Sequence, residues 1–420
     1  MKSHSLITAL KNLRGNPRGC VYPEPLWGIP FHLYSPYISI YMLAIGLAER
    51  EIGLILSVSW GFQIVLALLS GAITDKLGRR RTTLIFDIIC WTIPSLISAV
   101  AQNFWYFLAA GIINSLWRIT HNSWTCLLVE DAEPDQLADI YSWIYIANLL
   151  VGFIAPLTGV LINNFSLVPT VRGLYFFAAF MFTLKAFVTY WLTEETRQGQ
   201  VRMHETRGQN MFHILRGYRE VFLTLIRTPR TLYTGAIMLI LSITSLISGS
   251  FWGIIVTEKL LIPEEYIAVF PFIRSAIMLA FFFVVIPRLN RLHFKVPMVV
   301  GFIGYVVSQV VLVSSPVLGY PTLILSVFIE ACSLAVVNPL VDQLAVLTID
   351  ARERARIQSI LYVGIILLTS PFGWIAGNLS EINKDLTFLL NIVLFAAGAV
   401  LAFIAGSLKK QIAETEVVAA

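Results

Sequence analysis

Twelve apolar runs, each about 20 residues long, constrain the fold of this chain more than any other feature. A helix needs about 20 mostly apolar residues to cross a hydrocarbon core about 30 Å thick. The runs are too long and too evenly apolar for the strands of a membrane barrel, which alternate over about ten residues. They occupy roughly residues 26–46, 52–74, 82–101, 106–127, 140–163, 173–192, 232–254, 265–287, 296–314, 321–347, 357–378 and 386–408. The sequence therefore predicts an all-α polytopic membrane protein with twelve transmembrane helices.

The composition excludes the other broad classes. Of the 420 residues, 57% are hydrophobic and 13% are charged, whereas soluble domains are about 45–50% apolar and about 25% charged. So few charges do not cover the surface of a soluble protein, and so many apolar residues exclude disorder. Four cysteines, with no obvious pair on the outer face, exclude a disulfide-stapled scaffold.

Basic residues are distributed unevenly between the predicted loops. The side that carries both termini holds 23 Lys and Arg residues, and the opposite side holds 4. The positive-inside rule therefore places both termini in the cytoplasm. The net charge of +5 reports this topology and gives no reason to expect nucleic acid as a partner. We expect a multi-pass protein of the cell (plasma) membrane, in contact with lipid.

The N-terminal segment precedes the first span. It is polar and basic, and no small-residue cleavage site follows the first apolar run, so we predict no cleaved signal peptide. Leu6, Leu10 and Leu13 share one helical stripe. This pattern favours either a short interfacial helix on the inner leaflet or a disordered tail.

One long internal loop, residues 194–231, follows the sixth span and becomes amphipathic from Met211 to about Ile226. Six spans on each side of a linker indicate a duplicated architecture. The predicted organisation is a cytoplasmic segment (1–25), an N-terminal six-helix half (26–193), a cytoplasmic linker (194–231), a C-terminal six-helix half (232–408) and a cytoplasmic tail (409–420).

The most specific motif lies between the second and third spans, at residues 71–81. Gly71 allows a neighbouring helix to approach closely within the bilayer, and Gly78 can adopt the positive φ that a very short turn needs. Asp75 is placed to accept hydrogen bonds from helix N-terminal amides or from an arginine. The basic residues that follow Gly78 anchor the turn to the inner leaflet.

This segment resembles the signature loop of the major facilitator superfamily, Gly-x-x-x-Asp-(Arg/Lys)-x-Gly-(Arg/Lys)-(Arg/Lys). All six positions match, at Gly71, Asp75, Lys76, Gly78, Arg79 and Arg80. Residues 195–197, Glu-Thr-Arg, are similar to the family's Pro-Glu-Thr-(Lys/Arg) ending, with Glu194 where proline usually stands. The resemblance implies two six-helix halves with pseudo-two-fold symmetry around a central cavity, and rocker-switch alternating access. It also implies that the loop from Asp75 to Arg80 acts as a cytoplasmic gate that latches the two halves.

Two further family patterns are only partly present. The loop after the eighth span, residues 288–295, keeps basic residues but lacks the glycines and the aspartate. The antiporter pattern of span 5, Gly-x-x-x-Gly-Pro-x-x-Gly-Gly, keeps Pro156 and Gly159, whereas two of its glycines are lost. These departures weaken an assignment as a drug/proton antiporter without excluding it.

Charged residues within predicted spans are costly and usually face a cavity or a partner. For Asp87 we predict a structural salt bridge with the basic residues at 79–81. Lys185 lies about two turns from the inner end of its span. Its side chain either extends along the helix so that the ammonium reaches the membrane surface, or has a functional role. Asp342 either ties the cytoplasmic gate or is structural.

Arg274 and Glu330 lie at equal depth, about 13 Å from the outer end at 1.5 Å per residue, so an ion pair between them is plausible. Burial favours protonation of a carboxylate, whereas a close arginine opposes it. Glu330 is therefore a candidate proton or substrate site, and a static pair is the alternative.

Arg118, His121 and Asn122 follow at i, i+3 and i+4 on one face of the fourth span. In the family, spans 1, 4, 7 and 10 line the cavity, and an arginine in span 4 recurs in proton-coupled antiporters. Here His121 and Asn122 replace the glycines that usually follow this arginine. We predict a charge and substrate site at this face, with a hydrogen-bonded structural histidine as the alternative.

Aromatic and polar residues of the cavity-lining spans are candidates for substrate contact. Tyrosine and tryptophan faces beside hydroxyl groups suit sugars or amphipathic aromatic molecules. Ordinary packing and interfacial belts are the alternative explanation. The candidates are His32, Tyr34, Tyr37, Asn122, Trp124, Ser245, Trp252 and Asn338.

The leading functional hypothesis is a secondary active transporter for a small organic solute, proton-coupled, with efflux favoured over uptake. The alternative is a proton-coupled uptake symporter for a nutrient such as a saccharide, and a membrane-embedded enzyme or sensor is more distant. The chain has no Gly-x-x-x-x-Gly-Lys-(Ser/Thr) nucleotide loop, no catalytic motif and no metal cluster. We therefore expect no cofactor and no enzymatic activity, with protons, the solute and membrane lipid as partners of a monomer.

Overall fold

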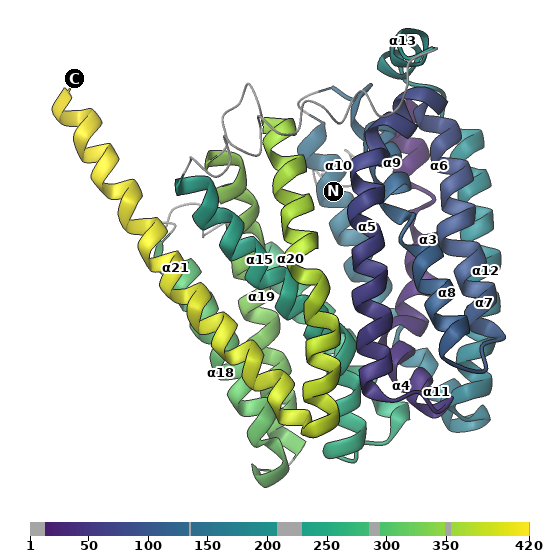
Figure 1. The fold of residues 1–420 in the computed structure, drawn as a ribbon, viewed down its shortest axis with the longest axis vertical. Coiled ribbons are helices and arrows are strands. Elements are labelled where there is room, and N and C mark those ends of the chain that lie inside the picture. Colours follow the sequence, from purple (N-terminus) through teal and green to yellow (C-terminus); the bar gives the residue numbers. More distant parts are fainter. Residues whose placement is uncertain are drawn as a thin grey trace, which may run out of the picture. The chain divides into compact units, whose positions relative to one another are not determined.

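The structure is a computed structural model that describes residues 13–133, 136–207, 229–284, 295–318, 320–348 and 354–419. Within these residues every regular element is a helix (Figure 1). Nine helical segments among them are long and apolar enough to cross a membrane. The chain divides into two compact units, Met1–Leu47 with Ile55–Arg216, and Ala48–Leu54 with Gly217–Ala420. The expected all-α polytopic class is confirmed.

The first unit contains most of the helices that precede the linker. They are α2 (Gly15–Val21), α3 (Glu24–Tyr34), η1 (Ser35–Tyr37), α4 (Ile38–Ala44), α5 (Glu49–Leu77, whose first turns belong to the second unit), α6 (Arg79–Asp87), η2 (Ile88–Thr92), α7 (Ile93–Ala99), α8 (Phe104–Asn114), α9 (Trp117–Val129), α10 (Leu137–Val151), η3 (Gly152–Ile154), α11 (Pro156–Phe165), α12 (Leu167–Leu192) and α13 (Arg197–Glu205). α12 packs against α3, α6 and α7, and α6 packs against α9. The buried rings of Tyr41, Phe107 and Phe182 lie in this unit.

Several expected spans of the first unit are interrupted helices. The first is α3, η1 and α4, with a proline in the first turn of η1, where proline's fixed φ is tolerated. The third is α6, the π-turn η2 and α7. The fourth breaks at Ser115–Leu116 between α8 and α9, where Ser115 Oγ donates to the Ser59 carbonyl at 2.9 Å. Ser115 Oγ also lies 3.0 Å from the Gly111 carbonyl of α8, so the hydroxyl serves a carbonyl at the break and links it to α5.

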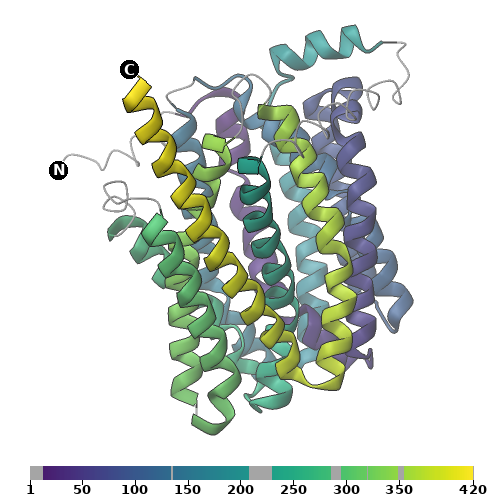
Figure 2. The ribbon, with the colours of Figure 1, turned by 60° about the vertical axis from the view of Figure 1, so that its left-hand side comes forward.

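The second unit contains α15 (Pro229–Ile254), η5 (Ile255–Lys259), η6 (Glu264–Tyr266), α16 (Val269–Val284), α18 (Lys295–Leu318), α19 (Tyr320–Thr348), α20 (Arg354–Ile382) and α21 (Lys384–Ala419). α18 packs against both α19 and α21, and α15 packs against α20 and α21 (Figure 2). The aromatic core of this unit includes Phe302, Tyr305 and Phe395, and the Tyr305 and Phe395 rings stack with centroids 4.4 Å apart. Ala48–Leu54, expected in the N-terminal half, groups with this unit, where Glu49 pairs with Lys384.

Three of the twelve expected spans are not among the nine long apolar helices of the described residues. Spans 26–46 and 106–127 are broken into short helices, and span 265–287 corresponds to α16, which has 16 residues. The count of twelve therefore stays a prediction. The expected amphipathic stretch from Met211 to Ile226 lies outside the described residues, as do Leu6, Leu10 and most of the loop 288–295.

The described part of the segment before the first span, from residue 13 onward, packs inside the first unit. Leu13 and Cys20 are buried together with Leu127 and Leu128 of α9, and a Cβ on Gly19 of α2 would lie 2.6 Å from the Leu192 carbonyl oxygen at the end of α12. Leu13 is therefore neither on a lipid-facing helical stripe nor in a disordered tail, the two alternatives that we expected for it. Apolar side chains along one stripe of a helix bury equally well against protein or lipid, and here the ends of α9 and α12 supply the partner.

Candidate functional site

The turn between α5 and α6 has the backbone conformation predicted from its glycine. Gly78 has φ 84° and ψ 156°, a region that is essentially restricted to glycine. A Cβ at this position would lie 2.5 Å from Glu195 Oε2 and 2.8 Å from Met203 Sδ. The short turn therefore needs glycine both for its φ and for the close approach of Glu195.

Glu195 caps the N-terminus of α6. Its Oε1 accepts from the Arg79 amide at 2.9 Å, and its Oε2 accepts from the Arg80 amide at 3.1 Å. Two helix N-terminal N–H groups thus find a charged acceptor, which the helix dipole favours. We expected Asp75 to accept from such amides or from an arginine, and it pairs with the Arg79 guanidinium at 2.9 Å.

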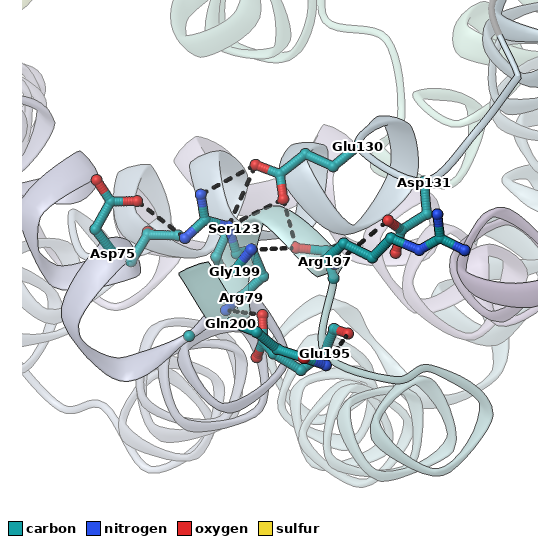
Figure 3. Close-up of polar contacts among 12 residues, drawn as sticks. Asp75, Arg79, Ser123, Glu130, Asp131, Glu195, Arg197, Gly199 and Gln200 are labelled. Carbon is teal, nitrogen blue, oxygen red and sulfur yellow. Dashed lines mark hydrogen bonds and ion pairs between the residues drawn. The ribbon is translucent and has the colours of Figure 1, made fainter. Parts of the chain in front are cut away.

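Arg79 is the centre of an ion-pair network within the first unit (Figure 3). Its buried guanidinium lies between Asp75 and Glu130, and its Nε is 3.0 Å from Glu130 Oε2. The same Glu130 oxygen accepts from Thr196 Oγ1 at 2.5 Å, so the end of α9 is tied to the start of α13. Arg80 stacks on the Tyr190 ring at 3.8 Å and donates to the Tyr190 carbonyl.

The departure from the family's proline at position 194 has a structural counterpart. The Glu194 amide donates to Asn16 Oδ1 at 2.8 Å, and Asn16 Nδ2 donates to Asp131 Oδ2 at 3.0 Å. Proline has no N–H and could not make the first of these bonds. The residue at 194 therefore helps to hold α2 against the ends of α9 and α12.

The other two residues of the motif make no comparable contact. A Cβ on Gly71 would meet no described atom within 4 Å, so the close helix approach that we expected there is not seen. Lys76 is exposed. Within the motif, the described contacts thus concentrate on Asp75, Gly78, Arg79 and Arg80.

The prediction that Asp87 pairs with the basic residues at 79–81 is wrong. Lys185 Nζ on α12 lies 2.7 Å from Asp87 Oδ2, and both side chains are buried. Thr120 Oγ1 on α9 donates to Asp87 Oδ1 at 2.6 Å. Lys185 therefore does not snorkel; its ammonium is held inside the unit because α6 and α12 pack together and bring the carboxylate to it.

The candidates of the fourth span lie on α9, and the side chains of Arg118 and Asn122 contact α5, whereas that of His121 is exposed. Arg118 Nε donates to Gln63 Oε1 at 2.9 Å, and its guanidinium stacks on Trp117 at 4.2 Å. Asn122 Nδ2 donates to Thr74 Oγ1 at 3.2 Å, whereas the exposed His121 lies beside Trp117 with ring centroids 5.4 Å apart.

In the second unit Arg274 on α16 and Glu330 on α19 form the expected ion pair. Arg274 Nη2 lies 2.7 Å from Glu330 Oε2. The two sides differ in burial, since 37% of the Arg274 side chain is exposed against 9% of Glu330. The ring of Tyr305, which stacks on Phe395, lies within the electrostatic influence of both charges of the ion pair. Asp342 lies in α19, but its side chain is outside the described residues.

The remaining cavity candidates differ in their surroundings. Tyr34 and Tyr37 are buried, and His32 Nδ1 bonds to the Gly28 carbonyl of its own helix at 2.9 Å. Ser245 and Asn338 are exposed on their helices, and Trp252 packs edge-on against Phe270. Their contact with a substrate stays a prediction.

Sequence reasoning missed Glu24, Glu130 and the capping role of Glu195. Glu24 begins α3 and lies near Lys185 and Asp87. An acidic residue two positions before the first expected span was the available signal. Glu130 gave no signal, because only the packing of α9 against α6 brings it to Arg79. No group of three or more metal-ligating side chains occurs among the described residues.

A family model described as Major Facilitator Superfamily matches residues 28–366. The chain belongs to the major facilitator superfamily. It is therefore a secondary transporter that works by alternating access, and not an enzyme. A comparison with curated proteins found no match.

Solved structures of other superfamily transporters share the fold. The nucleoside transporter NupG is similar with a TM-score of 0.69 and 14% identity, over 94% of this chain and 99% of that one. A bacterial homologue of the human lysosomal transporter Spinster has a TM-score of 0.69 and 12% identity, over 97% and 98%. The xylose transporter XylE from E. coli has a TM-score of 0.65 and 12% identity, over 94% and 97%.

Proposed function

We propose that this transporter exports a small organic solute in exchange for protons, and that Glu330 carries the exchanged proton. The Arg274–Glu330 pair supports the proposal, because a buried carboxylate is held next to a half-exposed guanidinium at 2.7 Å. Both residues lie within the second unit, on helices that pack against each other. A proton site of this kind needs a partner whose position can change while the carboxylate stays buried.

The physical basis is a competition between two ways of neutralising Glu330. With Arg274 in contact, the ionised carboxylate is stabilised by the guanidinium. If Arg274 moves away, the charge is left in an apolar environment, where protonation becomes favourable. A substrate or a helix movement that displaces Arg274 therefore loads Glu330 with a proton, and the return of Arg274 releases it.

The solute is proposed to contact the polar face of α9 in the first unit. Arg118 and Asn122 supply donors there, and Trp117 and Trp124 supply aromatic surface. Such a surface suits a polar or amphipathic organic molecule. The same proposal includes three further expectations. The transporter is a monomer in the plasma membrane, and both of its termini are cytoplasmic. The loop of Asp75 and Arg79 is the latch of the cytoplasmic gate.

The test begins with a thermal-shift panel of nutrients and amphipathic aromatic compounds on the purified full-length protein, which provides a probe. Flux of that probe is then measured in reconstituted vesicles with and without an imposed pH gradient. We expect wild-type flux to follow the gradient. Glu330→Gln should lose this dependence while it retains probe exchange at equal pH, and Glu381→Gln, at a half-exposed site, should behave as wild type.

Three results would contradict the proposal. Unchanged pH dependence of flux in Glu330→Gln removes the role of this carboxylate. Proton-driven accumulation of a saccharide, with binding lost in Arg118→Ala or Trp124→Ala, replaces export by uptake. Hydrolysis of the probe without flux would indicate chemistry rather than transport.

A further inference from the structure

A second buried group of charges lies in the first unit and has no part in the mechanism above. It consists of Glu24 at the start of α3, Asp87 at the end of α6 and Lys185 on α12. α3 and α6 both pack against α12, which places Glu24 within the electrostatic influence of Lys185 and Asp87. We call these three residues the Glu24 cluster.

Asp87 has donors on both of its oxygens. Lys185 Nζ lies 2.7 Å from Oδ2, and Thr120 Oγ1 donates to Oδ1 at 2.6 Å. A carboxylate that accepts two such bonds is stabilised in its ionised form. Asp87 and Lys185 therefore form a complete ion pair that carries no net charge.

Glu24 is the unsatisfied member of the cluster. Its Oε2 is fully buried and has no hydrogen-bond partner among the described residues. An ionised carboxylate left in this way pays a desolvation cost that its neighbours do not offset. Since Asp87 already pairs with Lys185, ionisation of Glu24 gives the cluster a net charge of −1, whereas one bound proton makes it neutral.

The neighbouring polar groups of the described residues other than Lys185 add no positive charge beside Glu24. The Cys20 thiol on α2 belongs to the same environment, and burial raises its pKa to about 12, so the thiol is uncharged. Trp124 on α9 places its ring 5.9 Å from Lys185 Nζ, and its own buried Nε1 lacks a partner among the described residues. Glu24 as a whole is half-buried, but its Oε2 has no exposed surface, so a proton can bind at this oxygen.

We propose that Glu24 is a second proton-binding site of this transporter, in which one proton forms an O–H bond with its buried Oε2 beside the Lys185–Asp87 pair. The proton comes from bulk water, and its uptake changes the charge of the cluster from −1 to zero. The coupling of this proton to solute movement rests on the proposed function. Its binding does not, and is measured without any solute.

Infrared titration of the purified full-length protein tests the binding. The C=O stretch of a protonated, buried carboxyl group should be present in wild type and should disappear as pH is raised. Labelling glutamate with ¹³C should shift this band, which separates Glu24 from Asp87. Glu24→Gln should lack the band, and Glu330→Gln, which removes the proton site of the proposed function, should retain it.

The dependence on the neighbouring pair provides a second measurement. Asp87→Asn removes one negative charge and leaves Lys185 free to pair with Glu24, so the band should titrate at lower pH than in wild type. This variant decides the matter even if Glu24→Gln does not fold. Absence of a glutamate band at every pH, its persistence in folded Glu24→Gln, or an unchanged titration in Asp87→Asn would each overturn the proposal. None of these results bears on Glu330, whose test is the pH dependence of flux.

Discussion

At the scale of single residues, many of the described polar contacts form where the ends of different helices meet. Glu195 accepts a hydrogen bond from an N-terminal amide of α6, and Glu130 forms an ion pair with the Arg79 guanidinium. Glu194 contributes only its amide, which bonds to Asn16. The side chain at 194 can therefore vary, whereas its N–H is part of the structure.

Replacing Glu194 by proline tests this role of the amide. Thr193 already has the extended conformation (φ −115°, ψ 155°) that a residue before proline favours, so the main loss is the hydrogen bond to Asn16. We expect Glu194→Pro to destabilise the protein by about 1–2 kcal/mol, measured as a lower Tm in detergent.

Glu194→Ala is the matched control, because it removes the side chain and keeps the N–H. It should melt as wild type does. In an Asn16→Ala background, Glu194→Pro should cost nothing further, since the acceptor is already gone. Equal melting of Glu194→Pro and Glu194→Ala in the wild-type background would refute the role of the amide.

At the scale of elements, interruptions of the spans coincide with specific contacts. The break between α8 and α9 is stabilised by Ser115, and Asn114 Nδ2 donates to the Cys90 carbonyl in the π-turn η2 at 2.8 Å. The turn between α5 and α6 depends on Gly78, where the chain reverses next to Glu195. These contacts therefore lie at the starts of α6 and α9.

Gly78→Ala should therefore destabilise the first unit. A Cβ in this backbone region costs about 1–3 kcal/mol, and it would also press on the Glu195 carboxylate that caps α6. The measurement is the Tm of the purified variant. Gly71→Ala, in the same motif but with no described atom within 4 Å of the new Cβ, is the control. If both variants melt alike, the conformational role of Gly78 is wrong.

At the scale of the whole molecule, the charge distribution predicts one orientation in the membrane. An impermeant maleimide should label Arg202→Cys, on the exposed face of α13, in inside-out vesicles and not in intact cells, above the background of the parent protein. Asn164→Cys, exposed near the end of α11, should show the opposite pattern. Reversal of the two patterns would place the termini outside.

Local sequence patterns are enough to predict the all-α membrane class, the superfamily and the positive φ at Gly78. Hydropathy and turn stereochemistry are local properties, so runs of about 20 residues and a single glycine are enough to predict them. Equal depth made an ion pair between Arg274 and Glu330 plausible, and the packing of α16 against α19 brings the two charges together.

Only the tertiary structure decided which partner each remaining charge has. Asp87 lies close in sequence to Arg79–Arg81, yet its partner is Lys185, 98 residues away. Glu24 is isolated in the sequence and becomes part of a buried cluster when α3 packs on α12. The cost of burying a charge depends on every group that surrounds it in space, and sequence spacing does not specify those neighbours.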